Sequence, residues 1–139
     1  MSDPGLAPRG LRVAVILTGL SLLIWLPFED QNERPALFFS LLLCGLAGAF
    51  LLHRLGSLGV VPFWAYPLLG MLCGLALSPL AVLLLAVKSG LHSHLAPDYT
   101  IADLVSVLEK TPVWAGVGLL FGLSVGLWGK YRRGRLAGL

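Results

Sequence analysis

The sequence predicts an all-α protein, a four-helix transmembrane bundle with a short interfacial amphipathic helix between helices three and four. Only 12% of the 139 residues are charged, whereas about 25% is usual in a soluble domain. The charged residues gather in short clusters, separated by uncharged runs at 13–28, 35–52, 55–87 and 111–129. Because a helix needs roughly 20 residues to cross a hydrocarbon core of about 30 Å, these runs predict four spans in a single membrane domain, 1–139.

The first span is expected at about 11–28 and the second at about 35–53. The first uncharged run is short, but Arg12 can extend it by placing its guanidinium group among the lipid headgroups. No small-residue cleavage site follows the run, so we expect an uncleaved span rather than a signal peptide. Pro35 suits the first turn of the second helix, and Gly56 and Gly59 are expected to end it.

The third uncharged run is too long for one span, so its first part is expected to approach along the interface before a span at about 62–89. Pro79 should kink this helix, with Ser78 or a neighbouring helix satisfying the carbonyl group that the proline leaves unpaired. The two cysteines, Cys44 and Cys73, fall inside spans, where we expect packing residues rather than a disulfide.

The interfacial helix is expected at about 100–110, and the fourth span at about 112–130. Thr100 and Asp103 have the spacing of a capping box, with Asp in place of the usual Glu or Gln. One apolar stripe follows at helical spacing, consisting of Ile101, Leu104, Val105 and Leu108. A short helix with one apolar stripe is typical of a segment that lies in the membrane interface.

The distribution of cations predicts the orientation, with both the N-terminus and the C-terminus on the cytoplasmic side. One face would carry seven basic residues, Arg9, Arg12, Arg54, Lys130, Arg132, Arg133 and Arg135. The other face would carry three, Arg34, Lys88 and Lys110. The cations at 130–135 would also attract anionic lipid, at roughly 1 kcal/mol each, but their role in setting the orientation already accounts for them.

Four tryptophans are expected to anchor the helices at the two membrane interfaces. Trp25 and Trp114 would lie at one interface, and Trp64 and Trp128 at the other. This grouping agrees with the topology that the cations predict.

Two stripes of small residues predict close helix packing. Gly70, Gly74 and Ser78 recur every four residues in the third span, and Gly118, Gly122 and Gly126 recur in the fourth. Small residues at this spacing let a second helix backbone approach closely. The stripes indicate either packing within the same bundle, which we favour for any single stripe, or a face for a second copy or another subunit.

A possible metal site lies in the segment before the interfacial helix. His92, His94 and Asp98 occur within seven residues, and imidazole nitrogens with a carboxylate are the ligands that zinc, copper or iron take. The alternative is that they are ordinary polar residues at a wet helix end, beside a Lys88 that extends its ammonium group to the surface. Their spacing matches no established metal motif, so we favour the second interpretation, and no cofactor is expected.

The functional interpretation is a non-catalytic accessory or structural subunit of a membrane complex, not an enzyme. The soluble segments are too short for a catalytic domain, and no acidic residue falls within a predicted span, whereas proton-coupled carriers usually place an ionisable group there. Expected partners are the lipid bilayer and a second copy or larger complex. Nucleic acid is not expected, because the cations flank the membrane segments. The alternatives are a metal or cofactor site at the outer surface and a small oligomeric channel or carrier.

Overall fold

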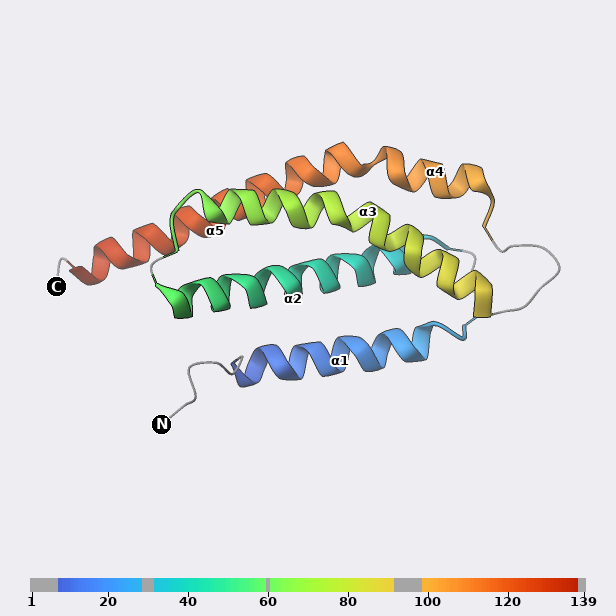
Figure 1. Ribbon diagram of the computed structural model, residues 1–139, viewed down its shortest axis with the longest axis horizontal. Helices are drawn as coiled ribbons and strands as arrows, with labels where there is room; N and C mark the ends of the chain where they lie inside the picture. The colour runs from blue at the N-terminus through green and yellow to red at the C-terminus, as the bar shows by residue number, and fades with distance from the viewer. Residues whose placement is uncertain (1–7, 29–31, 60, 92–98, 138–139) are drawn as a thin grey trace.

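The chain folds into helices joined by short connections. The computed structural model describes residues 8–28, 32–59, 61–91 and 99–137, which contain five helices and no strand. The helices are α1 (Arg9–Trp25), α2 (Arg34–Leu58), α3 (Ala65–Leu91), α4 (Ile101–Glu109) and α5 (Thr111–Ala137). Figure 1 shows the long helices running side by side along the molecule. The prediction of an all-α protein is confirmed.

Three helical segments are long and apolar enough to cross a membrane. They are Arg34–Leu58, Ala65–Leu91 and Ile101–Arg132, of which the last combines α4 with most of α5. The chain therefore has the character of a membrane protein, as the uncharged runs predict. The remaining long helix, α1, has 17 residues and a length of about 25 Å at 1.5 Å per residue, slightly short of the hydrocarbon thickness.

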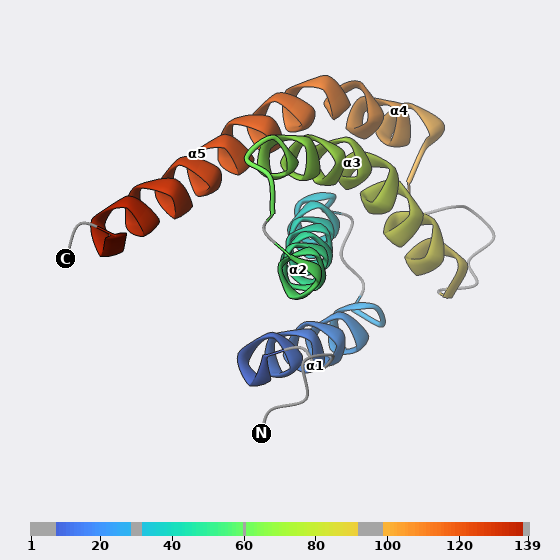
Figure 2. The ribbon, with the colours of Figure 1, turned by 60° about the vertical axis from the view of Figure 1, so that its left-hand side comes forward.

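Helix α3 forms the centre of the arrangement. It packs most extensively against α5 and on its other side against α2, while α1 lies beyond α2 (Figures 1 and 2). Among the described helices, only α2 comes close to the backbone of α1. The order of the helices is therefore α1, α2, α3 and α5, and α1 has the fewest neighbours.

The helix ends differ from the expected span ends. Helix α2 passes through Gly56 and stops at Leu58, where Gly59 follows with a positive φ of 155°. Helix α5 continues through the basic residues to Ala137. The reason is that charge marks where a chain leaves hydrocarbon, whereas backbone conformation decides where a helix ends. One internal glycine costs a helix only about 1 kcal/mol, which tertiary packing can offset.

Pro79 lies inside α3, as expected, and Figure 1 shows the helix bending in its second half. A proline removes one backbone hydrogen bond and crowds the preceding turn, which explains a bend at this point. Ser78 does not compensate in the expected way. Its side chain is fully buried, and its Oγ atom has no hydrogen-bond partner among the described residues.

Helix α4 begins with the capping box that the sequence predicts. The Thr100 hydroxyl accepts a hydrogen bond from the Asp103 amide, and the Asp103 carboxylate accepts one from the Thr100 amide at 2.9 Å. The apolar residues of α4 fall on two faces, however. Val107 is fully buried against the core, whereas Ile101 at the start of the predicted stripe is 81% exposed.

The helix therefore packs through Val107 and Leu104, and of the predicted stripe only Leu104 lies against the core. Only Lys110 separates α4 from α5, and Figure 1 shows α4 continuing the path of α5 with a bend. The interfacial position of α4 stays a prediction, and its exposed apolar residues are available to lipid.

Replacing Thr100 by Ala should destabilise α4 by about 1 kcal/mol, because loss of the hydroxyl leaves the Asp103 amide without its acceptor. Hydrogen exchange of the 101–109 amides would measure the change. In the variant, exchange should become faster in α4, whereas the exchange rates in α3 should stay as in the unchanged protein. Ser106→Ala is the matched control, since its hydroxyl donates only to the Asp103 carbonyl within the same helix. Equal exchange in the two variants would contradict a stabilising cap.

Candidate functional site

The most unusual residue of the structure is Lys88, a cation inside the bundle. It lies in the last turn of α3, and only 1% of its surface is exposed. The expectation that Lys88 extends its ammonium group to the surface is therefore wrong. Leu84 and Leu85, one turn earlier, are also buried, so Lys88 continues the inward face of α3 at helical spacing.

Trp25 of α1 covers the ammonium group. The Lys88 Nζ atom lies 4.6 Å from the centroid of the indole ring, within the range of a cation–π interaction. The same ring packs against Phe39 of α2 at a centroid distance of 5.3 Å. Such an interaction contributes about 2 kcal/mol or more when water is excluded. The contact links α3 to α1, whose backbones do not otherwise approach each other.

The residues next to this pair form the main apolar core. The core is formed by residues of α2, α3 and α4, and by Tyr99, which precedes the Thr100 cap of α4. Its buried members are Ala36, Phe39, Ala81, Leu84, Leu85, Tyr99 and Val107. Trp25 is partly buried against the same cluster. Its indole Nε1 is shielded from solvent and has no hydrogen-bond partner among the described residues. In such a low-dielectric surrounding, the indole N–H would interact strongly with an acceptor that reaches it.

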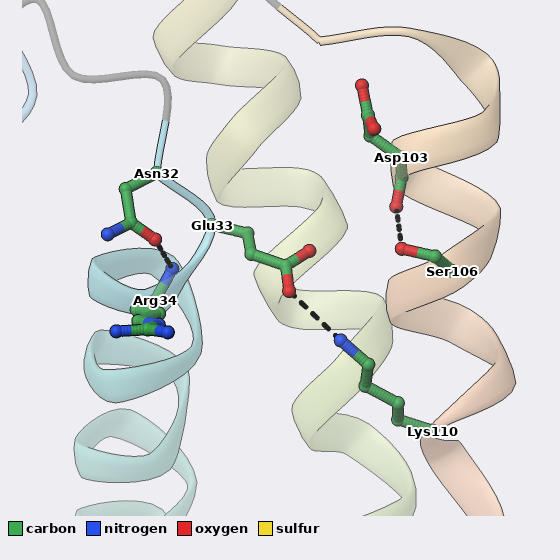
Figure 3. Close-up of polar contacts among 6 residues, drawn as sticks. All are labelled: Asn32, Glu33, Arg34, Asp103, Ser106 and Lys110. Carbon is green, nitrogen blue, oxygen red and sulfur yellow. Dashed lines mark hydrogen bonds and ion pairs between the residues drawn. The ribbon is translucent and has the colours of Figure 1, made fainter.

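A polar layer lies at the same end of the bundle. Lys110, between α4 and α5, forms an ion pair with Glu33 before α2, at 2.9 Å from Nζ to Oε1 (Figure 3). Beside it, the Arg34 amide donates to Asn32 Oδ1 at 3.0 Å. The ion pair is solvent-exposed, so it contributes about 1 kcal/mol at most. It connects distant segments of the chain without strongly stabilising them.

The two small-residue stripes face each other between α3 and α5. A Cβ atom at Gly70 would overlap the carbonyl oxygen of Gly118, and one at Gly118 would overlap that of Gly70. A Cβ at Gly74 would lie 2.9 Å from the Ala115 Cα atom. Gly122 has the same relation to the Tyr66 carbonyl. The close approach of these two helices therefore requires glycine.

The ends of the two stripes behave differently. A Cβ at Gly126 would meet the side chains of Phe63 and Tyr66 at 3.1 and 3.2 Å rather than backbone atoms. Ser78 is fully buried at the other end of its stripe. Most of both stripes is thus occupied within one chain.

The tryptophans expected as interface anchors fall into two groups. Trp25 and Trp114 are turned partly inward, and the indole Nε1 of each is buried. Trp64 and Trp128 lie at the opposite end and are 64% and 59% exposed. The two groups lie at opposite ends, whereas anchoring at a membrane interface stays a prediction for all four tryptophans.

Both cysteines are free thiols inside the helices. The Cys73 thiol of α3 donates a hydrogen bond to the Cys44 carbonyl oxygen of α2, at 3.3 Å. A Cβ at Gly48 would be 3.0 Å from the same sulfur, so the thiol fills the space that this glycine leaves. The contact supports packing roles for these residues.

The proposed metal ligands His92, His94 and Asp98 lie outside the described residues. Within the described ranges, no group of three or more His, Cys, Asp or Glu side chains is placed to hold a metal ion. The structure therefore gives a site around Lys88 and no geometry for the histidine segment.

Comparison with protein-family models, curated proteins and solved structures gives no significant match. The class of protein follows from the chain alone, as a helical protein with apolar helices of membrane-spanning length. The buried Lys88 is the functional candidate that the charge pattern did not reveal. One signal was present in the sequence, because Lys88 follows Leu84 and Leu85 at the spacing of a single helix face.

Proposed function

We propose that the chain is an integral membrane protein with four spans, α1, α2, α3 and α5, and with both termini on the cytoplasmic side. The apolar residues that follow Trp25 lengthen the first segment beyond α1, which supports a fourth span. The seven-cation end of the bundle contains the start of α1 and the ends of α2 and α5. Cations flanking short loops favour the cytoplasmic side.

We further propose that the protein is a non-catalytic accessory or structural subunit, assembled with copies of itself or with another membrane protein. The observation that carries this proposal is the sparse packing of α1. Thr18 is its only buried residue, and its outward side chains Ile16, Leu20 and Leu23 are more than half exposed.

Small residues also remain available on the outer faces of the bundle. A Cβ atom at Gly19, Gly45 or Gly116 would meet nothing within 4 Å. Lipid and apolar side chains are equally favourable neighbours for an apolar helix, so membrane helices associate where small residues permit close contact. These glycines offer such positions on α1, α2 and α5.

Photo-crosslinking in native membranes tests the assembly. A photoreactive amino acid at Leu20 should form an adduct with a second polypeptide, either another copy or a different subunit. The same group at Val82, which packs against the core, should give only intramolecular products. If Leu20 reacts only with lipid, and the protein stays monomeric in mild detergent, the accessory role is wrong.

A second candidate function is a small channel or carrier for an anion, and the burial of Lys88 favours it. Ionisable side chains inside membrane bundles commonly mark the path of a charged solute. Lys88 lies in the last turn of α3, so it would meet a charged solute near one end of the bundle rather than at the bilayer midplane. Chloride flux into proteoliposomes tests this function, with loss of flux expected in Lys88→Met. Absence of flux in the unchanged protein would remove chloride as a candidate.

A further inference from the structure

The C-terminal part of α5 extends beyond the other helices and carries arginines stacked on aromatic rings. Figures 1 and 2 show this part, in red, continuing past the end of α2 and the start of α3. Its stacked residues are Trp128, Tyr131, Arg132 and Arg135, which we call the arginine ladder. None of the four belongs to the buried core cluster of the described residues, so core packing does not explain their arrangement.

The ladder holds its guanidinium groups in defined positions. The Arg132 Cζ atom lies 5.3 Å from the centroid of the Trp128 ring, and the Arg135 Cζ atom lies 5.1 Å from that of Tyr131. Each pair is separated by four residues, so its members are neighbours on one helix surface. Arg135 also donates a hydrogen bond to the Tyr131 hydroxyl. Stacking and hydrogen bonding restrict these side chains before any ligand arrives, which reduces the entropy lost on binding.

All four side chains are accessible. Trp128 and Tyr131 are 59% and 55% exposed, and both arginines are classed as exposed. A guanidinium group has five N–H donors in a planar fork, and Tyr131 takes only one of those of Arg135. The remaining donors match the oxygens of a phosphate group, which arginine binds through two parallel hydrogen bonds.

The charge at this end of the molecule is strongly one-sided. The seven acidic residues of the chain are at positions 3, 29, 30, 33, 98, 103 and 109, so none lies in α5. Among the described residues, the acids lie at the opposite end, beside the Glu33–Lys110 ion pair. Within the described part of the chain, an anion at the ladder would meet no competing carboxylate.

We propose that the arginine ladder binds the phosphate group of an anionic phospholipid. Apolar residues of α5 precede the ladder directly, and Phe121 and Leu127 among them are 70% and 53% exposed. Along α5, the apolar residues thus come before the arginines that can bind phosphate. A phospholipid has its acyl chains and its headgroup in the same order along the membrane normal. A nucleic acid or an acidic peptide would use the cations but leave the apolar part uncovered.

The inference rests on the proposed membrane placement but is independent of the accessory role. Native mass spectrometry of the detergent-solubilised protein tests it, with equal amounts of phosphatidylglycerol and phosphatidylcholine added. The unchanged protein should retain phosphatidylglycerol in preference to phosphatidylcholine. The double variant Arg132→Lys and Arg135→Lys keeps the net charge but loses the planar fork, so the preference should fall about fivefold. Arg9→Lys, at the same end of the bundle, is the control and should not change it.

The outcomes separate specific recognition from general attraction. If the double lysine variant keeps the full preference, charge alone accounts for the lipid and the ladder has no defined role. A second variant, Trp128→Leu, keeps both arginines but removes one supporting ring, and it should also reduce the preference while leaving the helical circular dichroism unchanged. Equal retention of both lipids by the unchanged protein would overturn the inference. Because lipid is counted on single chains, failure of the Leu20 crosslink would not affect this result.

Discussion

Replacing Gly118 by Ala is expected to destabilise the protein by about 3 kcal/mol. The added Cβ would overlap the carbonyl oxygen of Gly70, a backbone atom that cannot move without shifting α3. Unfolding by sodium dodecyl sulfate in mixed micelles, followed by circular dichroism, would measure the loss. Since α3 and α5 share the most extensive contact, the change should also lower the cooperativity of unfolding.

Two other glycines of α5 provide controls for this prediction. Gly116 has open space around its added Cβ, so Gly116→Ala should be neutral or stabilise the helix by up to about 1 kcal/mol. Gly126 faces the side chains of Phe63 and Tyr66, which can rotate, so Gly126→Ala should cost about 1 kcal/mol. The order Gly118, Gly126, Gly116 is the specific expectation. Similar stabilities for Gly118→Ala and Gly116→Ala would contradict the close approach of α3 and α5.

The positions of the helices could be predicted because a charged side chain costs much free energy in hydrocarbon. Charged residues are therefore confined to the segments between the apolar runs. The uncharged runs therefore located the helical segments, although the ends of α2 and α5 differ by several residues. The capping box at Thr100 and Asp103 was equally predictable, since both partners lie within one turn. These features depend on local sequence.

The inward faces of the helices were harder to predict. In a soluble protein the apolar stripe of a helix marks its buried side, but a membrane helix is apolar on both its lipid side and its protein side. Helix α4 illustrates the difficulty, because Val107 is buried while Ile101 of the predicted stripe is exposed. The pairing of the α3 and α5 stripes likewise depends on tertiary packing, which spacing alone does not specify.

Lys88 combines both difficulties. Its position near the end of an uncharged run suggested an exposed cation, and a lysine there commonly extends to the headgroups. The structure instead covers it with Trp25, which comes from a helix more than sixty residues earlier in the sequence. A contact of this kind depends on how α1 lies against α2, and no local pattern encodes that arrangement.

Replacing Lys88 by Ala should destabilise the protein by about 3 kcal/mol. The change removes the cation over the Trp25 ring and leaves a cavity where the buried side chain lay. The same detergent titration measures the loss, and Trp25 fluorescence should shift as water enters. Lys110→Ala is the matched control, because its ion pair with Glu33 is exposed and should contribute about 1 kcal/mol at most.

Lys88→Met separates the structural contribution of this residue from its charge. Methionine is unbranched and fills nearly the same volume, so it leaves little of the cavity that alanine creates. We therefore expect Lys88→Met to recover at least half of the stability that Lys88→Ala loses. If an apolar residue can replace a buried charge without loss of stability, the charge is not needed for folding. Loss of chloride flux or of the Leu20 crosslink in a stable Lys88→Met would then identify the charge as functional. If Lys88→Met is as unstable as Lys88→Ala, the ammonium group itself holds α1 against the bundle, and its role is structural.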